Sequence, residues 1–133
     1  MLTLLKRVHE VLTGSTPLVT KLGGSAQIGT NLRKKPDQPA IEYGFDTGSI
    51  ESGNKEIQSL RVSVYGTTSH EDTLEIAELV TDLLTPKALS SVTLNLHCGM
   101  CSKTRNTVLP STDFNHQIDM TFRVLFTATP SSH

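Results

Sequence analysis

The sequence predicts an α+β fold: a single two-layer domain with a mostly antiparallel sheet of about four to five strands and two amphipathic helices packed on one face. Several segments alternate apolar and polar residues, which is typical of strands with one buried face. Two other segments carry apolar residues at helical spacing. The chain has 133 residues, a length typical of one domain. Residues 1–133 are therefore expected to form one domain.

The chain begins with an expected amphipathic helix over about residues 2–12. Charged residues lie opposite its apolar face, and Gly14 provides a helix end. The stretch TPLVTKLG that follows suits a short second turn or helix before the next glycines. The apolar face of the first helix consists of Leu4, Leu5, Val8, Val11 and Leu12.

Two extended segments come next. In PAIEYGFD, the residues Ile41, Tyr43 and Phe45 share one face of a strand. In SLRVSVYG, alternate apolar positions again share one face, from Leu60 to Val64. Residues 47–56, TGSIESGNKE, separate these strands and are rich in Gly, Ser and charge. We expect a loop there, one that is long for a hairpin connection.

A second amphipathic helix is expected over residues 69–84. Thr68 and Glu71 match a T-x-x-E capping box, and Asp72 adds a negative charge to the first turn. Pro86 ends the helical pattern. The apolar stripe consists of Ile76, Ala77, Val80, Leu83 and Leu84.

Two more strands are expected in the last third of the chain. SVTLNLHC places Val92, Leu94, Leu96 and Cys98 on one face. QIDMTFRVLFTA has the most regular alternation in the sequence. Between them, MCSKTRNTVLPSTD at residues 100–113 shows no pattern and is expected to be a second long loop. The apolar face of the closing strand consists of Ile118, Met120, Phe122, Val124 and Phe126.

Composition excludes several broad classes. Lys plus Arg total 12 and Asp plus Glu total 13, so the formal net charge is -1 and no global field attracts nucleic acid or an anionic membrane. Any such contact would need a local patch. Charges interrupt the first apolar segment, so it does not read as a secretory signal. No stretch approaches the roughly 20 apolar residues of a membrane helix. We expect synthesis in a cytoplasm, where stable disulfides are uncommon.

The two cysteines lie in HCGMC, residues 97–101, as a C-x-x-C pair. A thioredoxin-type pair needs a following helix to lower the thiol pKa, and SKTRNTVLP has no apolar stripe. A structural zinc site needs four ligands, so His97 or His116 would have to join the two cysteines. On a strand, however, His97 would point away from Cys98. The sequence favours Cys98 as a small buried hydrophobic residue and Cys101 as a loop thiol. A zinc site is the next alternative, ahead of a redox pair.

No other constellation predicts catalysis. The histidines are spread over different segments, and Ser69-His70-Glu71-Asp72 is a sequential run whose better-supported role is helix capping. No nucleotide-binding, hydrolase or metalloprotease motif occurs. We therefore predict no catalytic, cofactor-binding or metal-binding residue. The sharpest local charge is Arg33-Lys34-Lys35 before a proline, which suits either a solvated loop or contact with a phosphate backbone.

The order of elements carries a family resemblance. LTLLKRVHEVLTG, PAIEYGFD and above all LRVSVYGTTSHEDTLEIAELVTDLL contribute to it. The last is a strand ending in an aromatic residue, a short polar turn and a helix of about four turns. The closing strand, with His116 and Asp119 before FRVLF, continues the pattern. Over most of its length the chain resembles tail terminator (tail completion, or head-to-tail joining) proteins of long-tailed bacteriophages, as a pattern and not through a diagnostic motif.

This resemblance implies a structural virion protein and not an enzyme. The family forms a ring, expected to be a hexamer, that caps the tail tube, stops its polymerisation and joins the tail to the head connector. The implied partners are further copies of the chain, the tail tube protein and the head-completion or connector protein, with DNA only in transit and no membrane. Arg33, Lys34 and Lys35 could then line the lumen or face DNA. The implied location is the head–tail interface of the virion, after synthesis in the host cytoplasm.

Three alternatives stay open. The chain could be another virion neck subunit or a tail tube subunit, because these share the ring habit. It could be a small zinc or redox protein that uses Cys98 and Cys101. It could also be an enzyme or binding module that uses the sheet face not covered by helices. Polar residues on that face include Arg61, Ser63, Tyr65 and Arg123, which equally suit a solvated face or a subunit interface.

Overall fold

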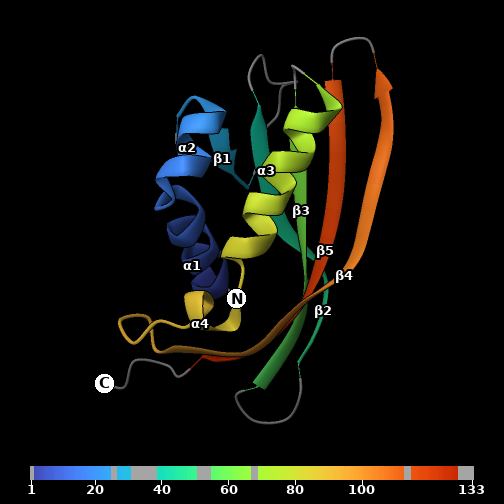
Figure 1. Cartoon of the computed structure of the whole chain (residues 1–133). Coiled ribbons are helices and arrows are strands. Elements are labelled where there is room, and N and C mark those ends of the chain that lie inside the picture. The colour runs from blue at the N-terminus through green and yellow to red at the C-terminus, as the bar shows by residue number, and fades with distance from the viewer. Residues whose placement is uncertain are drawn as a thin grey trace.

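The chain folds as one α+β domain, as the sequence predicts: a mixed five-stranded sheet carries its helices on one face (Figure 1). The computed structural model describes the backbone of residues 2–24, 27–30, 39–50, 55–66, 69–112 and 115–128. In chain order the elements are α1 (Leu2–Thr13), α2 (Thr16–Leu22), β1 (Ile28–Gly29), β2 (Ala40–Ile50), β3 (Lys55–Gly66), α3 (His70–Leu83), α4 (Pro86–Leu89), β4 (Leu96–Thr112) and β5 (Asn115–Ala128).

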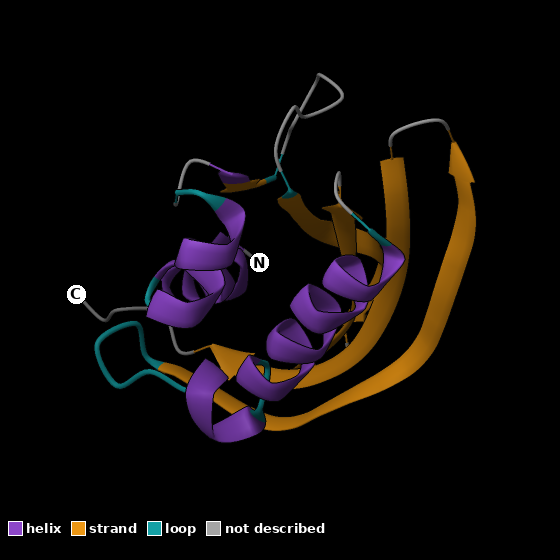
Figure 2. Cartoon of the chain, turned by 45° about the horizontal axis from the view of Figure 1, so that its top comes forward, coloured by secondary structure: helices purple, strands orange, loops and turns teal. Residues whose placement is uncertain are grey.

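The sheet order is β1-β2-β3-β5-β4. Only β1 and β2 are parallel, and every other neighbouring pair is antiparallel. The central pair, β3 and β5, is in continuous register from Lys55 opposite Thr127 to Gly66 opposite His116. The strands curve around the helices, so the sheet has a concave inner face and an outer face that none of the described helices covers (Figure 2).

The core lies between the inner sheet face and the two longer helices. Both predicted helices are confirmed: α1 buries its apolar face, and α3 buries Ile76, Ala77 and Val80. The regular alternation of the closing strand is also confirmed, since all of its predicted inward residues are at most 1% exposed. The short α2 lies where a second turn was expected, whereas α4 was not expected. None of the described helices is both long and apolar enough to cross a membrane.

The cap of α3 lies one residue later than predicted. Ser69 is the N-cap, and its Oγ accepts a hydrogen bond from the Asp72 amide at 3.1 Å. Thr68, the predicted cap, lies outside the described residues. The predicted T-x-x-E motif starts at Thr68, and the observed S-x-x-D motif starts at Ser69. Both residues carry a hydroxyl that can cap a helix, so the sequence alone does not decide between them.

The loop predicted over residues 47–56 is wrong for residues 47–50 and 55–56, which belong to strands, and residues 51–54 lie outside the described residues. Strand β2 continues through Ile50, and Ser49 pairs with Ile57 of β3. A register shift between Phe45 and Gly48 interrupts the alternation of inward and outward residues. A strand with such a β-bulge does not show a regular period of two in its sequence, so the pattern did not predict it. The hydrogen-bonded ladder therefore extends well beyond the apolar part of the hairpin.

The final third of the chain departs further from expectation. The loop predicted over residues 100–113 is instead most of β4, the edge strand next to β5. The strand predicted to start near Val92 begins only at Leu96. Val92 is 94% exposed because it lies in a tight turn closed by a bridge between Ser91 and Leu96.

A close approach at Gly66 gives a test of this packing. A Cβ added there would overlap the hydroxyl of Thr73, which is fully buried and donates a hydrogen bond to the Ser69 carbonyl at 2.8 Å. Gly66→Ala should therefore lower the free energy of unfolding by about 1–3 kcal/mol. Urea denaturation of the purified protein measures this change.

Gly44→Ala is the matched control, because no atom lies within 4 Å of the Cβ position at Gly44. Its stability should stay within about 1 kcal/mol of the parent and should not fall, since alanine restricts the unfolded chain more than glycine does. Equal stability of the two variants would contradict the contact between β3 and α3.

Candidate functional site

The cysteine pair lies on the inner side of β4. Cys98 is opposite Phe126 and Cys101 is opposite Val124, with a register shift between Cys98 and Met100. Phe126 and Val124 both face the core, so the extra residue at this bulge brings two cysteines of odd spacing to the same face. A regular strand would have placed them on opposite faces.

Cys98 is the small buried residue that the sequence predicts, with 3% exposure. Its amide donates to Ser90 Oγ at 2.9 Å, and its thiol donates to the Met100 carbonyl at 3.3 Å. The prediction of a loop thiol at Cys101 is wrong, because Cys101 lies within β4 and packs partly buried against the core. Both cysteines therefore belong to the packed inner face.

The electrostatics of the pair oppose thiol chemistry. Burial raises the pKa of the Cys101 thiol to about 12, and the neighbouring Cys98 thiol adds to the rise. Burial likewise raises the pKa of Cys98. Neutral thiols are poor nucleophiles and poor metal ligands. Within the described ranges, His, Cys, Asp and Glu side chains form no group of three or more that could hold a metal ion.

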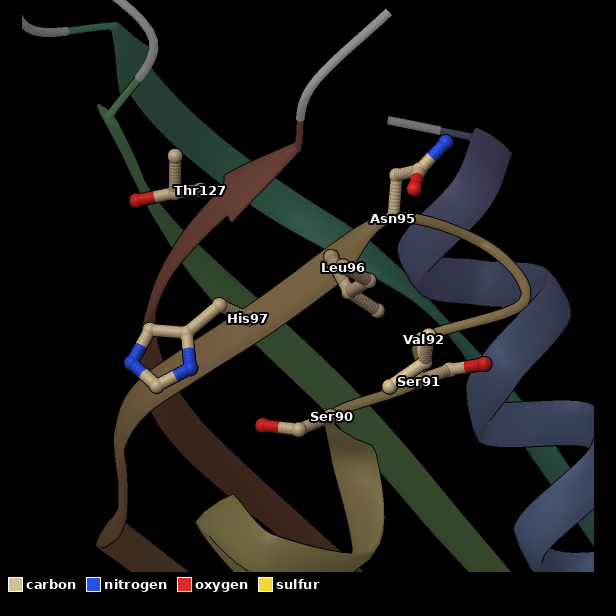
Figure 3. A pocket seen from close by; sticks show the side chains of 7 residues that line it. All are labelled: Ser90, Ser91, Val92, Asn95, Leu96, His97 and Thr127. Atoms are coloured by element: carbon tan, nitrogen blue, oxygen red, sulfur yellow. The ribbon is translucent and has the colours of Figure 1, made fainter. Parts of the chain in front are cut away.

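An open depression of about 430 Å³ lies beside the start of β4. It is lined by Ser90, Ser91, Val92, Asn95, Leu96, His97 and Thr127 (Figure 3). The serine hydroxyls are engaged locally: Ser90 Oγ donates to the Pro86 carbonyl and Ser91 Oγ accepts from the Leu94 amide. Neither bonds to His97 in the described part of the chain. The depression therefore lacks an activated nucleophile.

Among the described residues, the other histidines contact structural neighbours. His9 Nδ1 lies 2.8 Å from the Tyr43 hydroxyl and links α1 to β2. The rings of His70 and His116 lie 6.3 Å apart, between the start of α3 and β5. The run from Ser69 to Asp72 caps α3, in agreement with the interpretation from sequence.

The outer sheet face carries a polar network around Asp119 of β5. Its Oδ1 accepts hydrogen bonds from Ser63 Oγ at 2.7 Å and from Gln117 Nε2 at 3.0 Å. Its Oδ2 accepts one from Arg61 Nη2 at 3.3 Å. Next to it, the Tyr65 hydroxyl donates to Glu42 Oε1 at 3.5 Å. These bonds join side chains of β2, β3 and β5 across the ladder and leave Asp119 well satisfied.

The sequence named several of these outer residues but could not group them. Asp119 is the centre of the network, yet it was noted only as part of a strand pattern. The basic run Arg33, Lys34 and Lys35 lies outside the described residues, so its expected place in a lumen stays a prediction. A shallow hollow of about 160 Å³ adjoins the network and is lined by Thr30, Glu42, Tyr43, Gly44, Phe45, Arg61 and Ser63.

Comparisons with known proteins identify a structural neighbour. A chain from the structure described as "Virion of native gene transfer agent (GTA) particle" has a similar fold, with a TM-score of 0.73 and 16% sequence identity. The alignment covers 91% of this chain and 92% of that chain. No known protein family and no curated protein sequence matches. The likeness therefore shows a shared fold over nearly the whole length of both chains.

The buried cysteines lead to a measurable expectation. At pH 8, Cys101 should react with a disulfide reagent about a thousandfold more slowly in the native protein than a free cysteine does, because a pKa of about 12 leaves almost no thiolate. The rate should rise with pH up to that value. Absorbance of the released reagent measures both thiols, and Cys98→Ser isolates the signal of Cys101.

Full reactivity should return in urea, which provides the internal control. Rapid labelling of Cys101 in the folded Cys98→Ser protein would mean that its thiol is activated. That outcome would restore the redox alternative.

Proposed function

We propose that this chain is a structural protein of a phage-like virion, and specifically a tail terminator. Further copies would form a ring, expected to be a hexamer, on the end of the tail tube, stop its polymerisation and join the tail to the head connector. The observation that carries the proposal is the fold shared with a gene transfer agent virion chain over 91% and 92% of the two chains. The order of elements that resembles tail terminators adds the finer assignment.

The candidate site supports a structural role. The hydroxyls of Ser90 and Ser91 are bonded locally, and burial keeps the thiols of Cys98 and Cys101 neutral. Acyl or phosphoryl transfer requires an activated nucleophile or a charged clamp in a hollow. The largest of the hollows described above, beside the start of β4, contains neither. These observations favour assembly as the function.

A closed ring repeats one heterologous contact, so each subunit needs two different complementary patches. The sheet offers two unlike edges. Strand β4 forms one edge over its full length. At the other edge, β1 covers only Ile41 and Glu42 of β2, and within the described ranges no strand pairs with the rest of that edge. Unpaired strand edges are ready templates for a neighbouring chain.

The two long hairpins project from opposite ends of the sheet, as the register requires (Figure 1). The β2–β3 hairpin leaves one end of the central pair and the β4–β5 hairpin leaves the other. A subunit built in this way can reach a neighbour in the ring or a partner above and below it. We assign these hairpins and edges the contacts with other copies, the tube and the connector.

Shortening the β2–β3 hairpin tests this assignment. Replacing residues 50–56 by Asn-Gly would close a two-residue turn directly after the pair formed by Ser49 and Ile57. The core should stay intact, because the removed segment lies beyond the apolar part of the strands, and thermal unfolding should remain cooperative. Ring formation on the tube protein should be lost, as measured by light scattering and electron microscopy.

In the producing cell, the same variant should yield separate heads and tails. A control is Lys6→Ala on the exposed side of α1, which should assemble normally. Normal joining by the shortened protein would refute the role of the hairpin. If tails of normal length join heads in cells that lack the whole protein, the proposed function is refuted. Continuous growth of tubes from this chain alone would instead indicate a tube subunit.

A further inference from the structure

Three arginines lie together on the outer face of the sheet. Arg61 of β3 and Arg105 of β4 are both opposite Thr121 of β5, which lies between them. Arg123 is the next outward residue along β5. Because neighbouring strands lie about 4.8 Å apart, the backbones at Arg61 and Arg105 are roughly 10 Å apart. We call this group the arginine patch.

A bulge in β4 places one member of the patch. Ser102 is opposite Arg123 and faces outward, whereas Lys103 is opposite Phe122 and faces inward. The register shift between Lys103 and Arg105 then turns Arg105 outward. Without the extra residue, Thr104 would take that position and the guanidinium would point to the other side.

The patch is accessible and mostly uncompensated. All three arginines are exposed. Arg61 shares Asp119 with the polar network, but Arg105 and Arg123 have neither a hydrogen bond nor an ion pair within the residues that the structure describes. The helices lie on the other face of the sheet, as both views show (Figures 1 and 2).

One helix of the opposite layer, α3, is strongly acidic. Helix α3 contains no lysine or arginine, and its sequence HEDTLEIAELVTDL places acidic side chains along its solvent-facing side. Glu75 of this helix forms an ion pair with Lys21 of α2 at 2.6 Å. Basic residues of α1, α2 and α4 lie on the same layer, so the acidic surface is that of α3 and not of the whole helical layer. The acidic residues of α3 are Glu71, Asp72, Glu75, Glu78 and Asp82.

We infer that the arginine patch contacts the phosphodiester backbone of double-stranded DNA. Guanidinium groups match phosphate oxygens bidentately and remain charged at any physiological pH. Thr121 lies between Arg61 and Arg105, and Ser59 and Ser102 lie on either side of Arg123; these short hydroxyl side chains can add hydrogen bonds to phosphate or sugar. The face is an exposed sheet with no recognition helix, so the contact is weak and independent of sequence.

DNA binding by the patch does not need the ring. Only its position, on the wall of a channel through which DNA passes, rests on the proposed function. In such a ring the sheet would face the channel and the acidic α3 would face outward. A weak contact suits passage, since tight binding would retain the DNA.

Fluorescence anisotropy with a labelled, random-sequence DNA duplex tests the inference in the purified full chain. Binding should be measurable at about 50 mM salt and nearly lost at about 200 mM. The double variant Arg105→Gln with Arg123→Gln should bind at least about tenfold more weakly. Its salt dependence, the slope of log K against log salt, should fall by about 2, because each phosphate contact contributes roughly 0.9.

The matched control is Lys6→Gln with Lys87→Gln, which removes the same charge from exposed positions on the helical layer. It should bind DNA as the parent does. No binding at low salt, or an equal loss in the control, would overturn the inference.

Ring assembly is measured on the same samples. If the arginine variant loses ring formation while DNA binding is unchanged, the patch binds an acidic protein surface and the inference fails. If rings form but the parent does not bind DNA, the inference fails and the proposed function is retained. If DNA binds through the patch but no ring forms on the tube protein, the proposed function fails and the inference stands.

Discussion

The fold depends on the unbroken register between β3 and β5. Over its full length, each pair sends both side chains to the same face of the sheet, so Val62 meets Met120 inside and Ser63 meets Asp119 outside. A slip of one residue would exchange the two sets and bury charged groups such as Arg123. Because the helices need the inner set and the polar network needs the outer set, both layers are fixed by this one pairing.

The same pairing explains why the edge strand differs from the centre. Strand β4 adds to β5 at the rim of the area that α3 covers: Lys103 donates a hydrogen bond to Thr81 of α3 at 3.5 Å, yet residues 102–108 are exposed on both faces. Where an edge strand has no layer packed on it, neither face is buried and apolar side chains are not required. Backbone hydrogen bonds hold this part of the strand, and its side chains can be polar. Its bulges then become useful: one brings Cys101 to the core side and another turns Arg105 outward.

These features mark how far the sequence could predict the structure. The alternation from Ile118 to Phe126 and the apolar stripe of α3 were enough to predict the central strands, the helices and the α+β class. An element that buries one face has apolar residues at a regular spacing, which can be recognised in the sequence. The length of β4 could not be predicted, since its residues 102–108 are exposed and no burial selects apolar side chains there. Val92 continued an apolar period yet lies in a turn, where the exposed residue satisfies no packing requirement.

The candidate surface was harder to predict than the fold for a related reason. Arg61, Arg105 and Arg123 come from three strands, and only the register and a bulge bring them together. The sequence offered Arg33, Lys34 and Lys35 instead, because adjacent charges are visible without a fold. A run of basic residues can be recognised in the sequence alone. A patch on a sheet can be recognised only when the order and register of the strands are known.

The arginine patch and the acidic helix α3, which lie on opposite faces of the sheet, also bear on how copies could associate. If like faces met, either arginines or the carboxylates of α3 would be opposed, and both arrangements are repulsive at short range. Side-by-side contact through the unlike edges of β2 and β4 keeps equivalent faces on the same side of an assembly and avoids this opposition. Charge thus disfavours stacking through the faces, and the free edges favour lateral growth. Both features agree with the lateral contacts proposed above for a ring, in which the edges of the sheet, and not its faces, join neighbouring copies.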